Sequence, residues 1–157
     1  MTFAISDIMR KKLETIEEMA SVQEAAKKMK DKDVSSLLVV DTNGKPQGLV
    51  TERDLARKVC INDVHTSTVT NKEIMSFPLI TINATSSPSM AADMMLKKNV
   101  RHLLVIDNVN KPIGIITPLD FTRYQEYTVD KDKEAIEKVL ESYMPWADEG
   151  SEAFTGV

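Results

Sequence analysis

The chain has 157 residues, of which 42% are hydrophobic and 28% charged, so it can bury a continuous core and is not a disordered chain. Its net charge of -4 disfavours binding to a nucleic-acid backbone. The N-terminus lacks the basic-then-apolar order of a signal peptide, and no apolar run approaches the roughly 18 residues of a membrane span. One cysteine and two histidines make an internal disulfide impossible and a zinc site improbable. We therefore expect a cytoplasmic protein with no membrane, nucleic-acid or metal partner.

The sequence repeats itself at a shift of 66 residues. Ile8–Asp54 aligns without a gap with Ile74–Asp120, and the matches include Ile8-Met9 with Ile74-Met75 and Leu37-Leu38-Val39 with Leu103-Leu104-Val105. Two copies are too few for a solenoid. The repeat therefore predicts a pair of motifs packed face to face around a pseudo-two-fold axis.

Each copy begins with a short strand, around Thr15 or Thr81, and continues with an amphipathic helix. In the first copy Ser21–Glu24 is a capping box, and the following apolar positions share one helix face: Val22, Ala25, Ala26 and Met29. In the second copy a serine followed by proline, Ser87-Pro88, opens the helix. The pattern predicts that these helices end near residues 32 and 98.

Two strands and a further helix complete each copy. Residues 36–41 and 102–107 are apolar, each is followed by a turn, and residues 48–50 and 114–116 form the returning strands. The glycine before each returning strand permits a close backbone approach or simply follows from the hairpin. Residues 61–72 are polar without periodicity and are expected to link the two copies. The order of elements predicts an α/β (α+β) fold of two small sheets with flanking helices.

The last part of the chain differs from the repeats. Residues 131–144 carry an apolar helical stripe, formed by Ala135, Ile136, Val139, Leu140 and Tyr143. This stripe needs a partner, either the chain's own module or a second subunit. The tail from Pro145 is expected to be flexible or dependent on a partner.

The residues best suited to ligand binding lie where the returning strand of each copy ends and a helix begins. Thr51–Asp54 and Thr117–Asp120 each place a hydroxyl at the helix N-cap and a carboxylate three residues later. As a variant of the capping box, this pattern has a purely structural explanation. The functional alternative is that the helix N-terminus receives a phosphate while the carboxylate binds the hydroxyls of a ribose.

The complete order of these motifs, found twice, resembles the cystathionine beta-synthase (CBS) domain. The resemblance rests on Ile8-Met9, Thr15-Ile16, the Ala25-Ala26-x-x-Met29 helix, Val34–Asp41 and Gly48–Leu55, each with its second copy. It covers about residues 5–126 and implies a tandem pair, or Bateman module. The expected divisions are residues 1–62 for motif 1, 63–127 for motif 2 and 128–157 for the C-terminal helix and tail.

The resemblance implies two clefts that bind adenosine-containing ligands. The aspartates would hold ribose hydroxyls, and Thr51 and Thr117 the ribose or phosphate. The valines would line the adenine slots, with Thr15 and Thr81 at the slot edges, and the basic residues would reach phosphate. The implied site residues are Thr15, Val34, Thr51, Arg53, Asp54, Thr81, Val100, Arg101, His102, Thr117 and Asp120. The copies differ, because Leu119 replaces Arg53 while Arg101-His102 replaces Ser35-Ser36. The two sites are therefore expected to bind phosphate unequally.

These features predict a regulatory sensor of AMP, ADP or ATP that has neither catalytic activity nor a catalytic cofactor. The resemblance also implies a homodimer, formed through the helices that follow each Thr-x-x-Asp motif, and an unidentified regulated protein as a further partner. Two alternatives stay open: a ligand-free dimerisation scaffold and a sensor of S-adenosylmethionine. A nucleic-acid-binding module is disfavoured by the acidic balance of charge.

Overall fold

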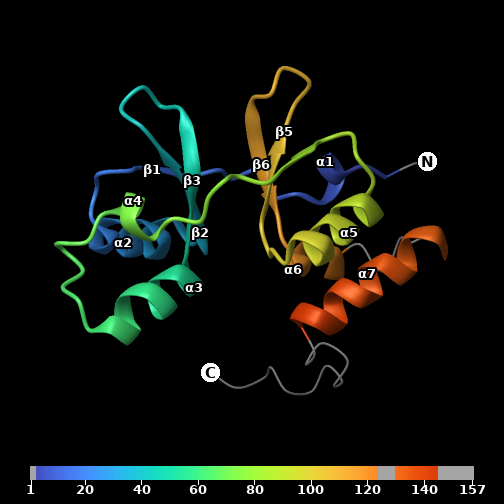
Figure 1. Ribbon diagram of the computed structural model, residues 1–157. Helices are drawn as coiled ribbons and strands as arrows, with labels where there is room; N and C mark the ends of the chain where they lie inside the picture. Colours follow the sequence, from blue (N-terminus) through green and yellow to red (C-terminus); the bar gives the residue numbers. More distant parts are fainter. Residues whose placement is uncertain (1–2, 124–129, 145–157) are drawn as a thin grey trace. The chain divides into compact units, whose positions relative to one another are not determined.

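A computed structural model describes residues 3–123 and 130–144 (Figure 1). The chain divides into two compact units, which we call the first unit (Lys12–Ile80) and the second unit (Met1–Lys11 with Thr81–Val157). Each unit contains a three-stranded sheet with flanking helices, which confirms the predicted α/β class. The units do not follow the boundaries of the sequence repeats, because the first residues of the chain belong with the second copy.

The first unit is a small sheet with helices at its flanks. Its elements are β1 (Thr15–Glu17), α2 (Val22–Lys32), β2 (Ser36–Val40), β3 (Pro46–Thr51), α3 (Glu52–Asp54) and α4 (Asn71–Ile74). β2 is the central strand, parallel to β1 and antiparallel to β3. α3 continues without a break through a π-helical turn and a 3-10 turn, Leu55–Val59 and Cys60–Asn62.

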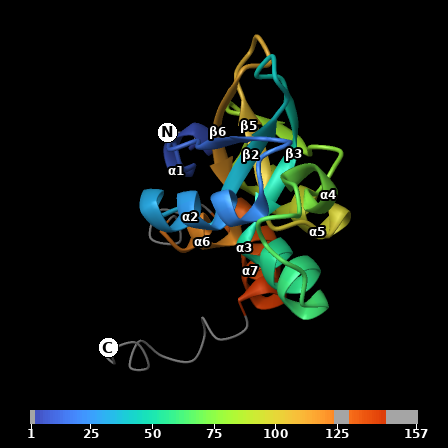
Figure 2. The same cartoon turned by 90° about the vertical axis from the view of Figure 1, so that its left-hand side faces the viewer.

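α2 has the boundaries and most of the apolar face that its sequence predicts. The Ser21 hydroxyl accepts a hydrogen bond from the Glu24 backbone N–H, and the Glu24 carboxylate accepts one from the Ser21 backbone N–H. The hydrogen bonds that the Glu24 carboxylate accepts from the backbone N–H and the hydroxyl of Ser21 lower the pKa of Glu24 below its usual value. Val22, Ala25 and Met29 are buried in the core of the unit, and α2 packs against β2 (Figures 1 and 2).

The second unit repeats this arrangement and adds one further helix. Its elements are α1 (Ile5–Ile8), β4 (Thr81–Asn83), α5 (Pro88–Lys98), β5 (Leu103–Ile106), β6 (Pro112–Ile116), α6 (Pro118–Thr122) and α7 (Asp130–Tyr143). α1 has the place that α4 has in the first unit, and α7 is the added helix. The sheet order is β4-β5-β6, with the same strand directions as in the first unit. No helix within the described ranges is long and apolar enough to cross a membrane.

α7 packs against α5 and α6 of its own unit, which decides between the two partners expected for its apolar stripe (Figure 1). Ile136, Val139 and Leu140 are buried there. This contact also accounts for a difference between the repeats, since Ala92 on α5 is fully buried whereas the equivalent Ala26 on α2 is exposed. Ala26, which the sequence places on the apolar face of the helix, is therefore not part of the buried face. The tail from Pro145 lies outside the described residues.

The glycines of the returning strands are required by a close backbone approach. Residue Ser76 exchanges backbone hydrogen bonds with Leu49 at 2.8 and 3.1 Å, and a Cβ atom at Gly48 would lie 2.8 Å from the Ser76 carbonyl oxygen. In the second unit a Cβ atom at Gly114 would lie 2.7 Å from the Arg10 carbonyl oxygen. Between the two explanations open from the sequence, the structure favours close approach, and the approaching segment comes from the same chain.

The predicted linker ends earlier than expected. Asn71, at the start of α4, is completely buried, and its side-chain amide donates to the carbonyl oxygens of Ala20 at 2.9 Å and Glu17 at 3.2 Å. These bonds satisfy backbone acceptors at the turn between β1 and α2. Residues 71 and 72 are therefore an integral part of the first unit, and their polar character misled the sequence prediction.

Candidate functional site

Strand register brings the candidate residues of the first unit to one end of its sheet. Thr15 begins β1, Ser36 begins β2 opposite Thr51, and Thr51 ends β3. The Glu52 backbone N–H donates to the Ser35 carbonyl oxygen at 3.0 Å, which ties the loop before β2 to the start of α3. The predicted residues therefore share one end of the sheet, together with half-buried Val34.

The second unit has the same layout. Thr81 begins β4, the pair Leu103 and Ile116 joins the start of β5 to the end of β6, and Thr117 follows directly. Val100 occupies the position of Val34, and both donate a backbone hydrogen bond of 3.0 Å to a helix carbonyl, that of Met95 or Met29. The two candidate sites thus rest on equivalent backbone.

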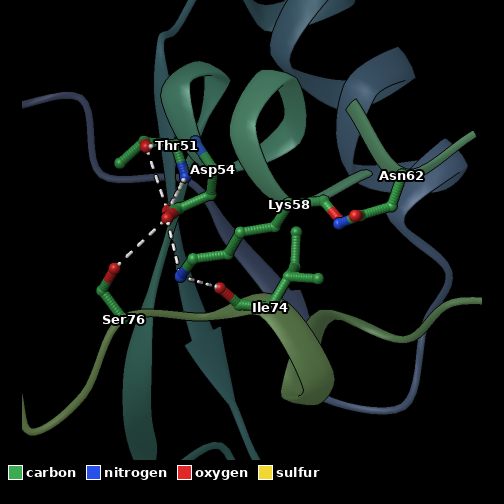
Figure 3. A network of polar contacts seen from close by, with 6 residues as sticks. All are labelled: Thr51, Asp54, Lys58, Asn62, Ile74 and Ser76. Carbon is green, nitrogen blue, oxygen red and sulfur yellow. Dashed lines mark hydrogen bonds and ion pairs between the residues drawn. The ribbon is translucent and has the colours of Figure 1, made fainter. Parts of the chain in front are cut away.

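Asp54 is buried and bonded on both carboxylate oxygens (Figure 3). Oδ2 accepts hydrogen bonds from the backbone N–H and the hydroxyl of Thr51, both at 3.0 Å, and the Asp54 backbone N–H returns one to Thr51 Oγ1 at 3.1 Å. Oδ1 accepts from Ser76 Oγ at 3.3 Å and pairs with Lys58 Nζ at 3.0 Å. Lys58 also donates to the Ile74 carbonyl oxygen at 2.7 Å, so it connects α4 with the helix that follows Asp54.

Asp120 is completely buried and has a different cation beside it. Its Oδ2 accepts from the backbone N–H of Thr117 at 2.8 Å and from the hydroxyl at 3.1 Å. Its Oδ1 pairs with Arg10 Nε at 3.4 Å. Arg10 and Ser76 are equivalent under the 66-residue shift, so the same backbone position supplies a guanidinium to one aspartate and a hydroxyl to the other.

The basic residues expected near phosphate lie in different settings. Arg53 is exposed in α3, and His102 is half-buried just before β5. Arg101 is half-buried, and its guanidinium carbon lies 5.0 Å from the ring centroid of Tyr143 in α7. This contact is a cation–π interaction, which attracts the arginine charge to the face of the ring.

Four residues near the candidate aspartates and Arg101 were missed from the sequence: Arg10, Lys58, Ser76 and Tyr143. Arg10 and Ser76 are equivalent positions with different residues and lie outside the motifs of the repeat, so no local pattern indicates them. Lys58 stands four residues after Asp54, the spacing of an ion pair on one helix face, and this spacing is a signal that could have identified it.

A hollow of about 540 Å³ opens in the first unit beside β1 and α2. Thr15 is the only candidate residue among those that line it, and its other lining residues include Glu17, Lys28 and Asp41. The hollow is therefore not the ribose site expected at Thr51 and Asp54. Within the described ranges, no group of three or more His, Cys, Asp or Glu side chains is arranged to hold a metal ion.

Comparison with known proteins identifies this architecture. The family model described as "CBS domain" matches residues 5–60 and 72–127, one match for each copy of the repeat. The chain belongs to the CBS domain family, and it contains a tandem pair of these domains.

Two relatives illustrate how such a pair occurs. The chain is 30% identical over 138 residues to an uncharacterized protein of Methanopyrus kandleri, a match that covers 88% of this chain and 70% of the relative. It is 32% identical over 122 residues to a homoserine O-acetyltransferase of Methanohalobium evestigatum, covering 78% of this chain but 24% of that enzyme. The chain thus spans about a quarter of the length of this second relative.

Solved structures show the same fold. A conserved protein of Pyrococcus horikoshii superposes with a TM-score of 0.74 at 28% identity, covering 83% of this chain and 97% of that one. A CBS domain pair crystallised with 5′-methylthioadenosine and S-adenosyl-L-methionine has a TM-score of 0.68 at 29% identity, covering 78% of this chain and 99% of that pair.

Proposed function

We propose that this protein is a non-catalytic regulatory sensor in which the two CBS domains bind adenosine-containing ligands, with AMP, ADP or ATP as the effector. The observation that carries the proposal is the Thr–Asp pair at the same end of both sheets, Thr51 with Asp54 and Thr117 with Asp120. A carboxylate beside a hydroxyl offers acceptors to the two hydroxyls of a ribose. The related CBS pair bound to two adenosine derivatives supports the same ligand class.

The partners of the aspartates support unequal sites. An ionised carboxylate has about four lone-pair positions. At Asp54, donors from Thr51, Ser76 and Lys58 make four contacts with the two oxygens, so a ribose has to displace one of them. At Asp120 the corresponding partners among the described residues are Thr117, with two contacts, and Arg10, with one. We therefore expect tighter ribose binding in the second unit.

The same contacts favour one competing function, a ligand-free scaffold for dimerisation. Both aspartates already have partners within the chain, as helix capping alone requires. In that case Thr51 and Thr117 stabilise helix ends and the candidate residues have no ligand. S-adenosylmethionine is the further effector to be tested, because the related pair was crystallised with it.

A thermal-shift panel of AMP, ADP, ATP, S-adenosylmethionine and adenosine tests the proposal. A ligand that binds only the folded chain stabilises it by roughly 2.7 kcal/mol at about 100 times its dissociation constant. We expect an upward shift in the melting temperature with at least one adenine nucleotide, and guanosine monophosphate is the control. If S-adenosylmethionine alone gives a shift, the nucleotide assignment is wrong, and if none does, the scaffold function is favoured.

We also propose that the protein acts as a cytoplasmic homodimer that controls another protein. Exposed apolar side chains lie in or after each Thr-x-x-Asp motif: Leu119, 43% exposed, within the second motif, and Ile61, 75% exposed, in the helical turn that follows the first. Exposed apolar residues of this kind are suited to a subunit interface. Light scattering over a range of concentrations is expected to give twice the mass of the chain. A mass of one chain at every concentration would contradict the dimer.

A further inference from the structure

The loop between α5 and β5 is fastened to α7 at two points. It runs from Asn99, the C-cap of α5 with a positive φ of 51°, through Val100 to Arg101. Tyr143 contacts both ends of this loop. Its hydroxyl donates to the Met95 carbonyl oxygen at 3.1 Å and lies 3.4 Å from Asn99 Oδ1, while its ring lies under the guanidinium of Arg101.

The Met95 carbonyl oxygen is the anchor of this arrangement. It accepts the backbone N–H of Asn99, which ends α5, and the backbone N–H of Val100 at 3.0 Å, in addition to the tyrosine hydroxyl. Met95 itself is completely buried. Tyr143 of α7 thus contacts the Met95 carbonyl, which fixes the backbone at the start of the loop, and the guanidinium of Arg101 at its end.

The first unit has no equivalent of this contact. Its corresponding loop runs from Asp33, with a φ of 53°, to Ser35, so the backbone turn is the same. Residues 12–80 contain no tyrosine, and α7 packs on the second unit. A role for Tyr143 in ligand binding is therefore confined to one of the two sites.

We infer that Tyr143 is a positioning residue that holds Arg101 ready for the phosphate of the ligand in the second unit, so that α7 sets the phosphate dependence of this site. The inference rests on the proposed function. The ring attracts the arginine charge without neutralising it, and the ion pairs found among the described residues do not include Arg101, so its guanidinium can attract a phosphate. Holding a long side chain in place before binding lowers the ordering cost at binding.

The test compares AMP with adenosine, because the ratio of their affinities measures the contribution of phosphate. Calorimetric titrations of the full chain are made with both ligands for wild type, Tyr143→Leu and Tyr143→Phe. In Tyr143→Leu the affinity ratio of AMP to adenosine should fall about two- to five-fold in one class of site, as expected for the loss of a cation–π contact. Tyr143→Phe keeps the ring and should retain most of the ratio.

Two further variants separate positioning from a structural role. Val139→Ala disturbs a buried residue of α7 without removing the Tyr143 ring, and it should leave the ratio unchanged. In an Arg101→Gln background, Tyr143→Leu should have no further effect on the ratio, because the tyrosine acts through Arg101. If wild type binds both ligands and Tyr143→Leu leaves the ratio intact, the inference is wrong while the proposed function stands. If wild type binds neither ligand, the inference is overturned, and the proposed function falls with it when ADP and ATP also fail to bind.

Discussion

Replacing both candidate aspartates, as Asp54→Asn with Asp120→Asn, is expected to leave the chain folded and to abolish binding of adenosine ligands. A hydrogen bond to a charged acceptor is worth about 1.5 to 3 kcal/mol, or roughly 10- to 150-fold in affinity at each site. Calorimetric titration with AMP measures the affinity, and chemical unfolding measures the stability. At each site the loss of binding free energy should exceed the loss of stability.

The expected cost in stability follows from the contacts of each carboxylate. Asparagine still accepts a hydrogen bond at the cap, so the capping loss is at most about 1 kcal/mol per site. Each ion pair adds a loss limited by solvent screening, because the Arg10 and Lys58 side chains are 36% and 44% exposed. We expect the double variant to lose about 1 to 3 kcal/mol in total.

A matched control uses a carboxylate with local hydrogen bonds that follows β2 at the end far from Thr51 and Asp54. Asp41 Oδ1 accepts from the backbone N–H groups of Asn43 and Lys45 in the turn before β3. Asp41→Asn likewise replaces a charged, locally hydrogen-bonded carboxylate with an amide, and it should leave the affinity for AMP unchanged. Unaltered titration curves for the double variant would show that Asp54 and Asp120 only cap helices.

The single variants test the inequality of the two sites. Asp120→Asn is expected to remove the tighter class of site and Asp54→Asn the weaker class, since Asp54 has more donors to displace. Equal affinities at the two sites would contradict this assignment of donors.

Local sequence patterns were sufficient to predict the amphipathic helices α2 and α5, but they did not identify the short repeated helices α1 and α4. The capping serines Ser21 and Ser87 mark the starts of α2 and α5, and both helices end at the residues expected, Lys32 and Lys98. These features depend on residues within one turn of each other, so the local sequence contains the information.

Contacts between distant residues could not be predicted in the same way. Arg10 is 110 residues from Asp120, and Asn71 is 51 residues from the Ala20 carbonyl that it binds. Nothing in the neighbourhood of either residue indicates its partner. Polar composition made Asn71 look like linker, although its burial depends on backbone carbonyls supplied by another part of the chain.

The largest effect on stability is expected at Phe121, the residue after Asp120. Phe121 is completely buried on α6, which packs against α7, whereas its counterpart in the first repeat, Leu55, is half-buried. Phe121→Ala leaves a cavity and should cost about 3 to 5 kcal/mol. Leu55→Ala should cost about 1 to 2 kcal/mol, because part of that side chain already contacts solvent.

Chemical unfolding of both variants measures this difference, with Phe121→Leu as the conservative control. Phe121→Leu retains most of the buried volume and should lose about 1 kcal/mol while keeping AMP affinity, because Asp120 and its Thr117 donors are unchanged. Equal losses of unfolding free energy for Phe121→Ala and Leu55→Ala would mean that packing against α7 adds nothing to the contribution of Phe121. In that case the packing of α6 against α7 would contribute little to the stability of the second unit.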